Sequence, residues 1–219
     1  MLSMPLKLAP RIVVYRVGSP PPLVEEGWLA LPQLPQEAGA TVFGDGSHPT
    51  TRLCAGAVDQ LCRRRQPKAV LDVGTGTGVL ARIARARGAQ FIVGTDIDPV
   101  ALSCAEAHSG LDTHPVGIHF SHEAPDHWGA RFDLVVANIL EEPLRHLALP
   151  LRRALLPAGV LLLSGFTRPQ TPALRLLYEK AELTFVRESH LDEWSMLTFE
   201  SLPPPAAISR PENTVLNCG

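Results

Sequence analysis

The residues of this sequence best suited to chemistry are a carboxylate with three glycines behind it and a second carboxylate further along. Asp72 opens the pattern D-x-G-x-G-x-G, whose glycines are Gly74, Gly76 and Gly78, and Asp96 ends the next apolar run. Glycine has no Cβ, so the backbone of such a turn can approach a ligand closely. A carboxylate placed like Asp96 can accept hydrogen bonds from both hydroxyl groups of a ribose. The spacing therefore predicts a nucleoside-binding turn.

Two cofactor classes use a turn of this kind. A dinucleotide site has the pattern G-x-G-x-x-G/A, which fails at Val79 when counted from Gly74 but fits at Ala81 when counted from Gly76. Asp72, however, would repel a pyrophosphate and suits the sulfonium and ammonium groups of S-adenosylmethionine. We therefore predict S-adenosylmethionine as the cofactor and keep NAD as the alternative. A turn that only packs a helix on a sheet is the third possibility.

Three elements must position these residues. Val70–Val73 is a short apolar run with one carboxylate, which predicts a central parallel strand. A helix is predicted from Val79 to about Arg87, and a second strand runs from Phe91 to Asp96. The helix would turn its aliphatic residues toward the sheet and the arginines Arg82, Arg85 and Arg87 toward solvent.

A second block that could carry chemistry, F-G-D-G-S-H-P-T-T-R-L-C, runs from Phe43 to Cys54. Pro49 suits the first position of a helix, and the glycines and threonines before the apolar stripe favour a close approach to a ligand. The simpler alternative is a capped helix entry behind a flexible loop. A single histidine such as His48 is more often a capping or packing residue than a catalyst.

Composition sets the outer limits of the interpretation. The chain has 219 residues, of which 45% are hydrophobic, enough for one domain with a full core. A formal net charge of -2 argues against nucleic acid as an obligate partner. The cysteines have no C-x-x-C spacing, no apolar run approaches the ~18 residues of a membrane span, and the start of the chain lacks a signal-peptide pattern. We therefore expect a cytoplasmic protein that binds no membrane.

Four blocks of the sequence together resemble the PrmA family. They are F-G-D-G-S-H-P-T-T-R-L-C, L-D-V-G-T-G-T-G-V-L-A, G-T-D-I-D-P-V-A and D-L-V-V-A-N-I-L-E-E-P-L, in the family's order and at near-identical spacing. The resemblance runs from about Gly27 to Phe199. Members of this family are bacterial methyltransferases that modify lysines and the N-terminal amine of large-subunit ribosomal protein eleven.

The resemblance implies a class I methyltransferase fold, that is, a Rossmann-like α/β fold with a seven-stranded, mostly parallel sheet and an antiparallel last strand. The remaining sequence pattern agrees with this fold. Further strands are expected at 116–120, 132–137 and 160–164, and helices at 99–108, 141–155 and 169–181. Leu183–Ser189 and Trp194–Phe199 flank Asp192-Glu193 as a C-terminal antiparallel hairpin, which a doubly wound dehydrogenase lacks at this place.

The resemblance also implies a set of site residues. The family's cofactor-contacting positions correspond to Thr51, Gly74, Asp96 and Asn138 of this sequence. Asp72, Gly76 and Gly78 join them from the glycine pattern, and the seven residues form the predicted cofactor site.

Asn138 is in addition the predicted catalytic residue. It stands where a parallel strand ends, and ligands of such sheets lie at the carboxyl ends of the strands. Its side-chain carbonyl can accept a hydrogen bond from an incoming amine and aim the lone pair of that amine at the methyl group. The segment Asn138–Glu141 also has the form of a helix cap with an acid three residues on, and this alternative stays open.

The predicted reaction is the in-line displacement of methyl from the sulfonium by a neutral amine, with no metal and no covalent nucleophile. A free lysine has a pKa of ~10.4, so presenting it neutral at pH 7 costs about 5 kcal/mol. Glu141, Glu142 and His48 are the candidate bases, and the sequence does not choose between them. Most of the acceleration would come from holding the amine and the methyl group in line.

The ends of the chain bear on the substrate. Residues 1–42 contain two predicted strands, Arg11–Arg16 and Gly27–Leu31, and are expected to form a cap or edge on a methyltransferase domain of residues 43–200. Residues 201–219 are expected to be a disordered tail. Family members usually carry a separate N-terminal domain that grips the ribosomal protein, and residues 1–42 are too few for it.

Three functional hypotheses follow. The first is a methyltransferase acting on protein amines, such as those of a ribosomal protein, with a minimal or different docking surface. The second is a small-molecule methyltransferase that lost the docking domain, and the third is a cofactor-binding module without catalysis. The methyl acceptor, the number of methyl groups transferred and the oligomeric state stay open.

Overall fold

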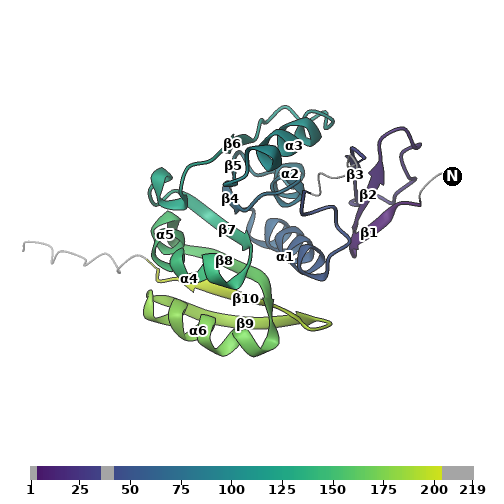
Figure 1. Ribbon diagram of the computed structural model, residues 1–219. Coiled ribbons are helices and arrows are strands. Elements are labelled where there is room, and N and C mark those ends of the chain that lie inside the picture. The colour runs from purple at the N-terminus through teal and green to yellow at the C-terminus, as the bar shows by residue number, and fades with distance from the viewer. Residues whose placement is uncertain (1–3, 36–41, 204–219) are drawn as a thin grey trace, which may run out of the picture.

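The computed structural model describes residues 4–35 and 42–203, and a seven-stranded sheet forms its centre (Figure 1). The strand order is β6-β5-β4-β7-β8-β10-β9. The first five strands in that order run parallel: β6 (His119–Ser121), β5 (Phe91–Thr95), β4 (Ala69–Val73), β7 (Phe132–Asn138) and β8 (Leu155–Thr167). β10 (Trp194–Ser201) is antiparallel to β8, and β9 (Leu183–Leu191) is antiparallel to β10. The predicted fold class, a mostly parallel sheet with a C-terminal antiparallel hairpin, is confirmed.

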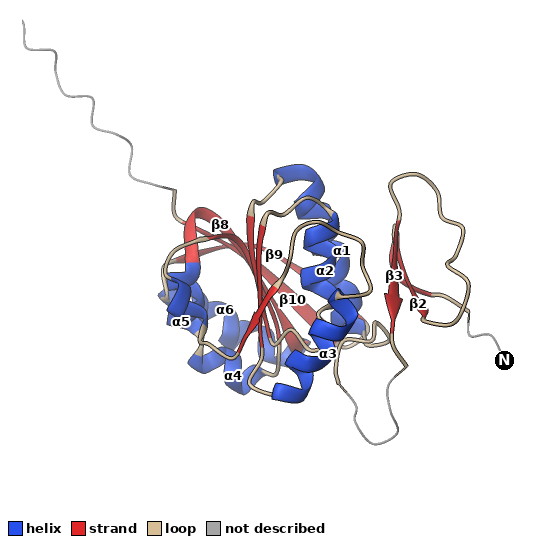
Figure 2. Cartoon of the chain, turned by 90° about the horizontal axis from the view of Figure 1, so that it is seen from above, coloured by secondary structure: helices blue, strands red, loops and turns tan. Residues whose placement is uncertain are grey.

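Helices cover both faces of this sheet (Figure 2). One face carries α1 (Pro49–Arg65), α2 (Val79–Ala86) and α3 (Pro99–Ser109), and the other carries α4 (Glu141–His146), α5 (Ala148–Ala154) and α6 (Thr171–Lys180). Two short 3-10 helices, η1 (Pro125–Trp128) and η2 (Arg168–Gln170), lie in the connections. The central strand β4 is buried along its whole length, as its apolar sequence requires for a strand covered on both faces.

A smaller sheet precedes α1. β1 (Leu6–Ala9) is antiparallel to β2 (Ile12–Arg16), and β2 is parallel to β3 (Leu29–Gln33). Their apolar side chains join the same core as α1 and α2. The sequence predicts β2 and β3 but not β1, whose four residues are too short a pattern to recognise. The domain boundary at residue 42 stays a prediction, and the predicted tail lies, from residue 204 on, outside the described residues.

One helix prediction and one strand prediction need correction. The single helix expected at 141–155 is two helices, α4 and α5, that meet at Leu147. Pro150 explains the break, because it has no N–H with which to continue the hydrogen bonding from α4 into α5. β6 is also shorter than the expected strand at 116–120 and begins later.

The arginines of α2 were expected to face solvent, and for two of them this is wrong. Arg82 is 0% exposed and Arg85 is 3% exposed. The loop after α3 brings Asp112 over the helix, where its carboxylate lies 2.7 Å from Arg82 and 2.5 Å from Arg85. Arg82 also donates to the carbonyl of Pro32 in β3 at 2.8 Å. Helical periodicity cannot reveal a partner that arrives from a distant loop.

Candidate active site

The polar residues predicted for the site lie in one row across the carboxyl ends of the parallel strands. Val73, the last residue of β4, pairs with the end of β5 on one side and with β7 on the other. The residues that follow in these three strands are Gly74, Asp96 and Asn138, which are therefore neighbours. Asn138 pairs in turn with Ser164 of β8. Ligands of open α/β sheets bind at this edge.

The glycine turn is built from left-handed backbone. The φ angles are 69° at Gly74, 53° at Gly76 and 76° at Gly78, a region that residues with a Cβ rarely adopt. The space that a Cβ would need is already filled by protein. At Gly74 it would lie 2.1 Å from the Ile139 side chain, and at Gly76 it would lie 2.2 Å from the carbonyl oxygen of Phe43. These positions need glycine for backbone conformation and internal packing.

The amide groups of the turn are engaged within the protein. Gly74 and Thr75 donate to the carbonyl of Thr95, Gly76 to Asp96 Oδ2, Thr77 to the carbonyl of Phe43, and Gly78 to the carbonyl of Thr75, all at 2.8–3.0 Å. A bound pyrophosphate needs unpaired amides at such a turn and at the helix that follows it. The arrangement therefore disfavours the NAD alternative.

Asp72 lies beneath the turn and is 1% exposed. Its Oδ2 accepts hydrogen bonds from Thr75 Oγ1 at 2.8 Å and from the amide of Ala81 at 3.2 Å. It thus supplies the negative charge that the N-terminus of α2 favours. Burial raises the pKa of Asp72 to about 7, against the lowering effect of these two hydrogen bonds. Its Oδ1 is buried and has no partner among the described residues.

Asp96 is half-buried and held by two backbone donors. Its Oδ2 accepts from the amide of Gly76 at 3.0 Å and its Oδ1 from the amide of Asp98 at 3.1 Å. A carboxylate has about four acceptor positions. Two of them stay available for the hydroxyl groups of a ribose, as the sequence suggested.

Asn138 is the last residue of β7 and is 7% exposed. Its Oδ1 is buried and has no hydrogen-bond partner among the described residues. The alternative that it caps the next helix is wrong, because α4 begins at Glu141 with Leu140 in the capping position and no side-chain cap. A buried amide oxygen without a partner costs about 1–3 kcal/mol, which points to a ligand that supplies the missing donor.

Thr51 shows the same feature. It lies in the first turn of α1, is 1% exposed, and its hydroxyl is buried without a partner among the described residues. The loop before α1 joins the glycine turn directly, since Thr77 donates its hydroxyl to the carbonyl of Gly44 at 2.6 Å and its amide to that of Phe43. The two predicted blocks therefore form one site.

An aromatic cluster lies beside this loop. The ring of His48 is edge-on to Phe43, with centroids 5.0 Å apart, and to Trp194, with centroids 4.6 Å apart. His48 also caps α1, accepting at Nδ1 from the amide of Thr50 at 3.3 Å. Trp194 opens β10, so the hairpin reaches the same edge of the sheet. The sequence signals only a strand there, and nothing in it indicates a role for Trp194 at the site.

The three candidate bases differ in their surroundings. Glu141 is paired with Arg145 and accepts from Gln170 at 2.5 Å, so its carboxylate is already committed. Glu142 is exposed on α4, and His48 is half-buried in the cap. Because Glu141 already has two partners, it is a poorer candidate base than the sequence indicated. Glu142 makes no specific contact with the described residues.

No cluster of metal-binding side chains occurs in residues 4–35 and 42–203. In the same part of the chain, no helix is long and apolar enough to cross a membrane.

The sheet order, the antiparallel hairpin and the glycine turn followed by Asp96 define the class I methyltransferase fold. A crystal structure of the ribosomal protein L11 methylase from Lactobacillus delbrueckii subsp. bulgaricus superposes with a TM-score of 0.77, over 91% of this chain and 100% of that one, at 24% identity. The family profile of the ribosomal protein L11 methyltransferases (PrmA) matches residues 24–201. The chain belongs to the PrmA family.

Curated relatives agree with this assignment. The ribosomal protein L11 methyltransferase of Bradyrhizobium diazoefficiens is 40% identical over 165 residues, which are 72% of this chain and 55% of the relative. That of Syntrophotalea carbinolica is 36% identical over 192 residues, 85% of this chain and 62% of the relative. The chain thus spans little more than half the length of the curated relatives it matches.

Proposed function

We propose that this chain transfers methyl groups from S-adenosylmethionine to amines of a protein substrate. The observation that carries the proposal is the buried, unpartnered Oδ1 of Asn138, in one row with Gly74 and Asp96 at the carboxyl edge of the sheet. Membership of the PrmA family supports it, because the relatives are named as methyltransferases of ribosomal protein L11. Ribosomal protein L11 is therefore the first candidate substrate.

The residues present fit this cofactor. Asp96 would accept hydrogen bonds from the ribose hydroxyls, and Thr51 and Asn138 offer buried polar atoms that lack partners. Because the amides of the turn are engaged, the site suits a ligand without phosphate groups better than a dinucleotide. Asp72 and the glycines act one layer further in, where they fix the turn and the start of α2. When bound, the cofactor supplies an electrophilic methyl group.

Asn138 would orient the amine. Its Oδ1 can accept a hydrogen bond from the incoming N–H, which leaves the nitrogen lone pair free to point at the methyl group. Holding the two reacting groups in line can provide several kcal/mol of the acceleration. The amine must arrive neutral, so a site that excludes water or a base reached through water must take its proton. We retain His48 and Glu142 for that role.

A small-molecule amine, the second hypothesis from the sequence, is the alternative acceptor. Labelled S-adenosylmethionine incubated with the chain and either isolated ribosomal protein L11, a dialysed lysate or the small-molecule fraction distinguishes the two. Label in protein supports the proposal, and label only in the small-molecule fraction refutes it.

We place the activity in the cytoplasm, where the free thiols of Cys54, Cys62 and Cys104 would stay reduced.

A further inference from the structure

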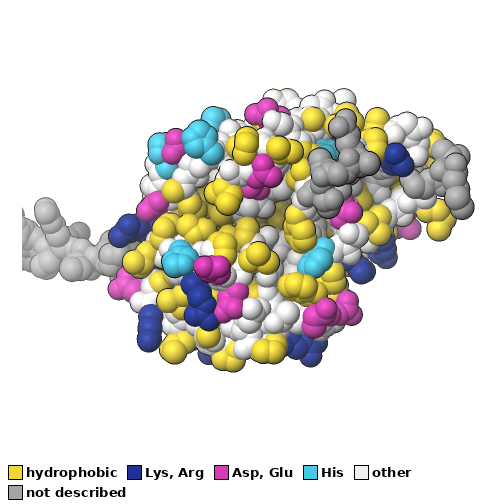
Figure 3. All heavy atoms as spheres, in the orientation of Figure 1, with side chains coloured by type: hydrophobic (Ala, Val, Ile, Leu, Met, Phe, Trp, Pro, Cys, Tyr) yellow, Lys and Arg dark blue, Asp and Glu magenta, His cyan; other side chains and the backbone are white. Residues whose placement is uncertain are grey.

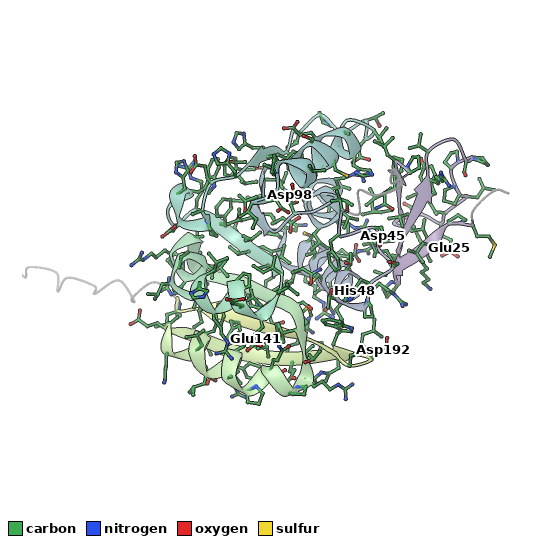
Figure 4. The ribbon with its side chains drawn as sticks, viewed as in Figure 1. Glu25, Asp45, His48, Asp98, Glu141 and Asp192 are labelled. Carbon is green, nitrogen blue, oxygen red and sulfur yellow. The ribbon has the colours of Figure 1, made fainter. Side chains whose placement is uncertain are left out.

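Three exposed carboxylates surround the edge of the sheet that holds the site. Asp45 lies in the loop before α1, Asp98 follows β5, and Asp192 lies at the turn of the β9–β10 hairpin. Figure 4 labels all three in one view, together with His48 and Glu141. We refer to Asp45, Asp98 and Asp192 as the acidic rim.

The charges of the acidic rim are not neutralised. None of the three carboxylates forms an ion pair with any residue in the described part of the chain, whereas Glu141 is paired with Arg145. Asp45 accepts only from Ser47, at 2.9 Å from the amide and 2.7 Å from the hydroxyl, and Asp98 accepts from the amide of Val100. Each is therefore free to attract a cation from solution.

Apolar side chains occupy the same edge. Phe43 is 47% exposed, Leu140 is 70% exposed and Ile97, between Asp96 and Asp98, is 95% exposed. Figure 3 shows carboxylates spaced around a central apolar area on this face. Aliphatic stems of long basic side chains can lie on such a surface while their charged ends reach a carboxylate. The side-chain oxygens of Asn138 and Thr51 lie behind this surface, buried and without a partner among the described residues, and a bound ligand could supply their hydrogen bonds.

We propose that the acidic rim docks a basic protein segment, so that the preferred methyl acceptor is a lysine flanked by arginines or lysines. This inference rests on the proposed function and specifies its substrate. The carboxylates come from three separate loops, which lie before α1, after β5 and between β9 and β10, so more than one residue flanking an acceptor can meet a carboxylate. Oppositely charged surfaces also raise the rate of encounter.

The rim should act on binding and not on the chemical step. A carboxylate beside the reacting amine would stabilise its protonated form and oppose the reaction. Next to the predicted position of the amine the site instead has the uncharged amide of Asn138, and the rim carboxylates lie in the surrounding loops. Neutralising the rim should therefore raise KM for a basic substrate and leave kcat unchanged.

The test compares two triple variants of equal charge change. The rim variant carries Asp45→Asn, Asp98→Asn and Asp192→Asn. Asparagine keeps the local structure at each position, because it can still accept from Ser47, still cap α3, and tolerates the φ of 54° at Asp192. The control variant carries Glu25→Gln, Glu106→Gln and Glu182→Gln, exposed positions outside the rim.

The probes are fluorescent peptides with one central lysine, flanked on both sides by arginine, serine or glutamate. Affinity is measured by anisotropy with S-adenosylhomocysteine present, and KM and kcat by transfer of labelled methyl. We expect the rim variant to weaken binding and raise KM for the arginine peptide by at least about fivefold, since exposed charge pairs are weak singly. The control variant should bind the arginine peptide as the unaltered chain does, and the rim variant should leave affinity and KM for the serine peptide unchanged. The preference should vanish in about 1 M salt, where the screening length falls to ~3 Å.

Equal binding of the arginine and serine peptides, or equal losses in the two variants, would overturn the inference. Efficient methylation of neutral peptides by both variants would refute the docking role of the acidic rim, while the proposed reaction survives. If arginine-dependent, rim-dependent binding occurs without any transfer, the docking inference holds and the proposed reaction fails.

Discussion

Replacing Asn138 by alanine should abolish most turnover while leaving the protein folded and able to bind its cofactor. The side-chain oxygen has no hydrogen-bond partner in the described protein and does not cap α4. Removing Oδ1 therefore breaks no hydrogen bond to the described residues. Relief of a buried unpaired acceptor, about 1–3 kcal/mol, offsets the small cavity that is left. We expect the free energy of unfolding to change by less than about 1 kcal/mol.

The kinetic effect should be larger. If Oδ1 holds the amine in the transition state, its loss resembles the removal of one preorganised hydrogen bond from an active site, which lowers kcat by about 10²–10³. Single-turnover methyl transfer at saturating cofactor measures this loss, and calorimetry with S-adenosylhomocysteine measures cofactor affinity. We expect kcat to fall far more than the affinity does.

Thr198 provides a matched control. Its hydroxyl is also buried without a partner among the described residues, but it lies within β10, away from the row of site residues. Thr198→Ala should leave turnover unchanged. If Asn138→Ala keeps normal turnover, the catalytic role is refuted. If it loses cofactor affinity in the same proportion as turnover, the side chain contacts the cofactor and not the amine.

The other predictions concern the buried and half-buried carboxylates. Asp96→Ala should weaken binding of S-adenosylmethionine by about 1–3 kcal/mol in calorimetry. Binding of NAD and not of S-adenosylmethionine by the unaltered chain would contradict the predicted cofactor. Burial raises the pKa of Asp72 to about 7 from an unfolded value near 3.9, so the stability it contributes is present below about pH 4 and lost as the pH rises to about 7. The free energy of unfolding in urea should therefore fall by about 2 kcal/mol between pH 5 and 8, and Asp72→Asn should remove this fall. An equal fall in both proteins would refute the raised pKa. Asp112→Ala should cost about 3–5 kcal/mol, because it leaves Arg82 and Arg85 buried without their anion, and a change below about 1 kcal/mol would show that water replaces the carboxylate.

The sequence predicts the main sheet well because its strands carry unambiguous local signals. β4 is an apolar run followed by the glycine turn, β7 is an apolar run that ends in Asn138, and the β9–β10 hairpin has a polar turn between its two strands. Features that depend on distant contacts could not be predicted. The burial of Arg82 needs Asp112, which lies thirty residues further along. The split between α4 and α5, in contrast, has a local signal in Pro150, which the apolar periodicity of residues 141–155 masks.

For the site, spacing and resemblance indicate which residues gather but not what each one does. By sequence, Asn138 is predicted to contact a ligand, and a helix cap stays open as the alternative. Only the observed start of α4 and the unpaired Oδ1 separate these roles. Trp194 is a residue that the sequence does not connect with the site. Only the folded hairpin, which brings its ring against His48, shows that it lies there.

The same reasoning separates the two cofactors that the glycine pattern allowed. G-x-G spacing is shared by both, so it cannot distinguish them. What differs is the anion at the turn. In a dinucleotide site the pyrophosphate of the ligand provides the negative charge, so the amides of the turn must be unpaired in the free protein. Here Asp72 and Asp96 provide it from within, accepting from Ala81 and Gly76, while carbonyl groups take the other amides of the turn. Because the turn already holds its own carboxylates, it disfavours a phosphate, and the acceptor positions left on Asp96 favour a ligand recognised through its hydroxyl groups.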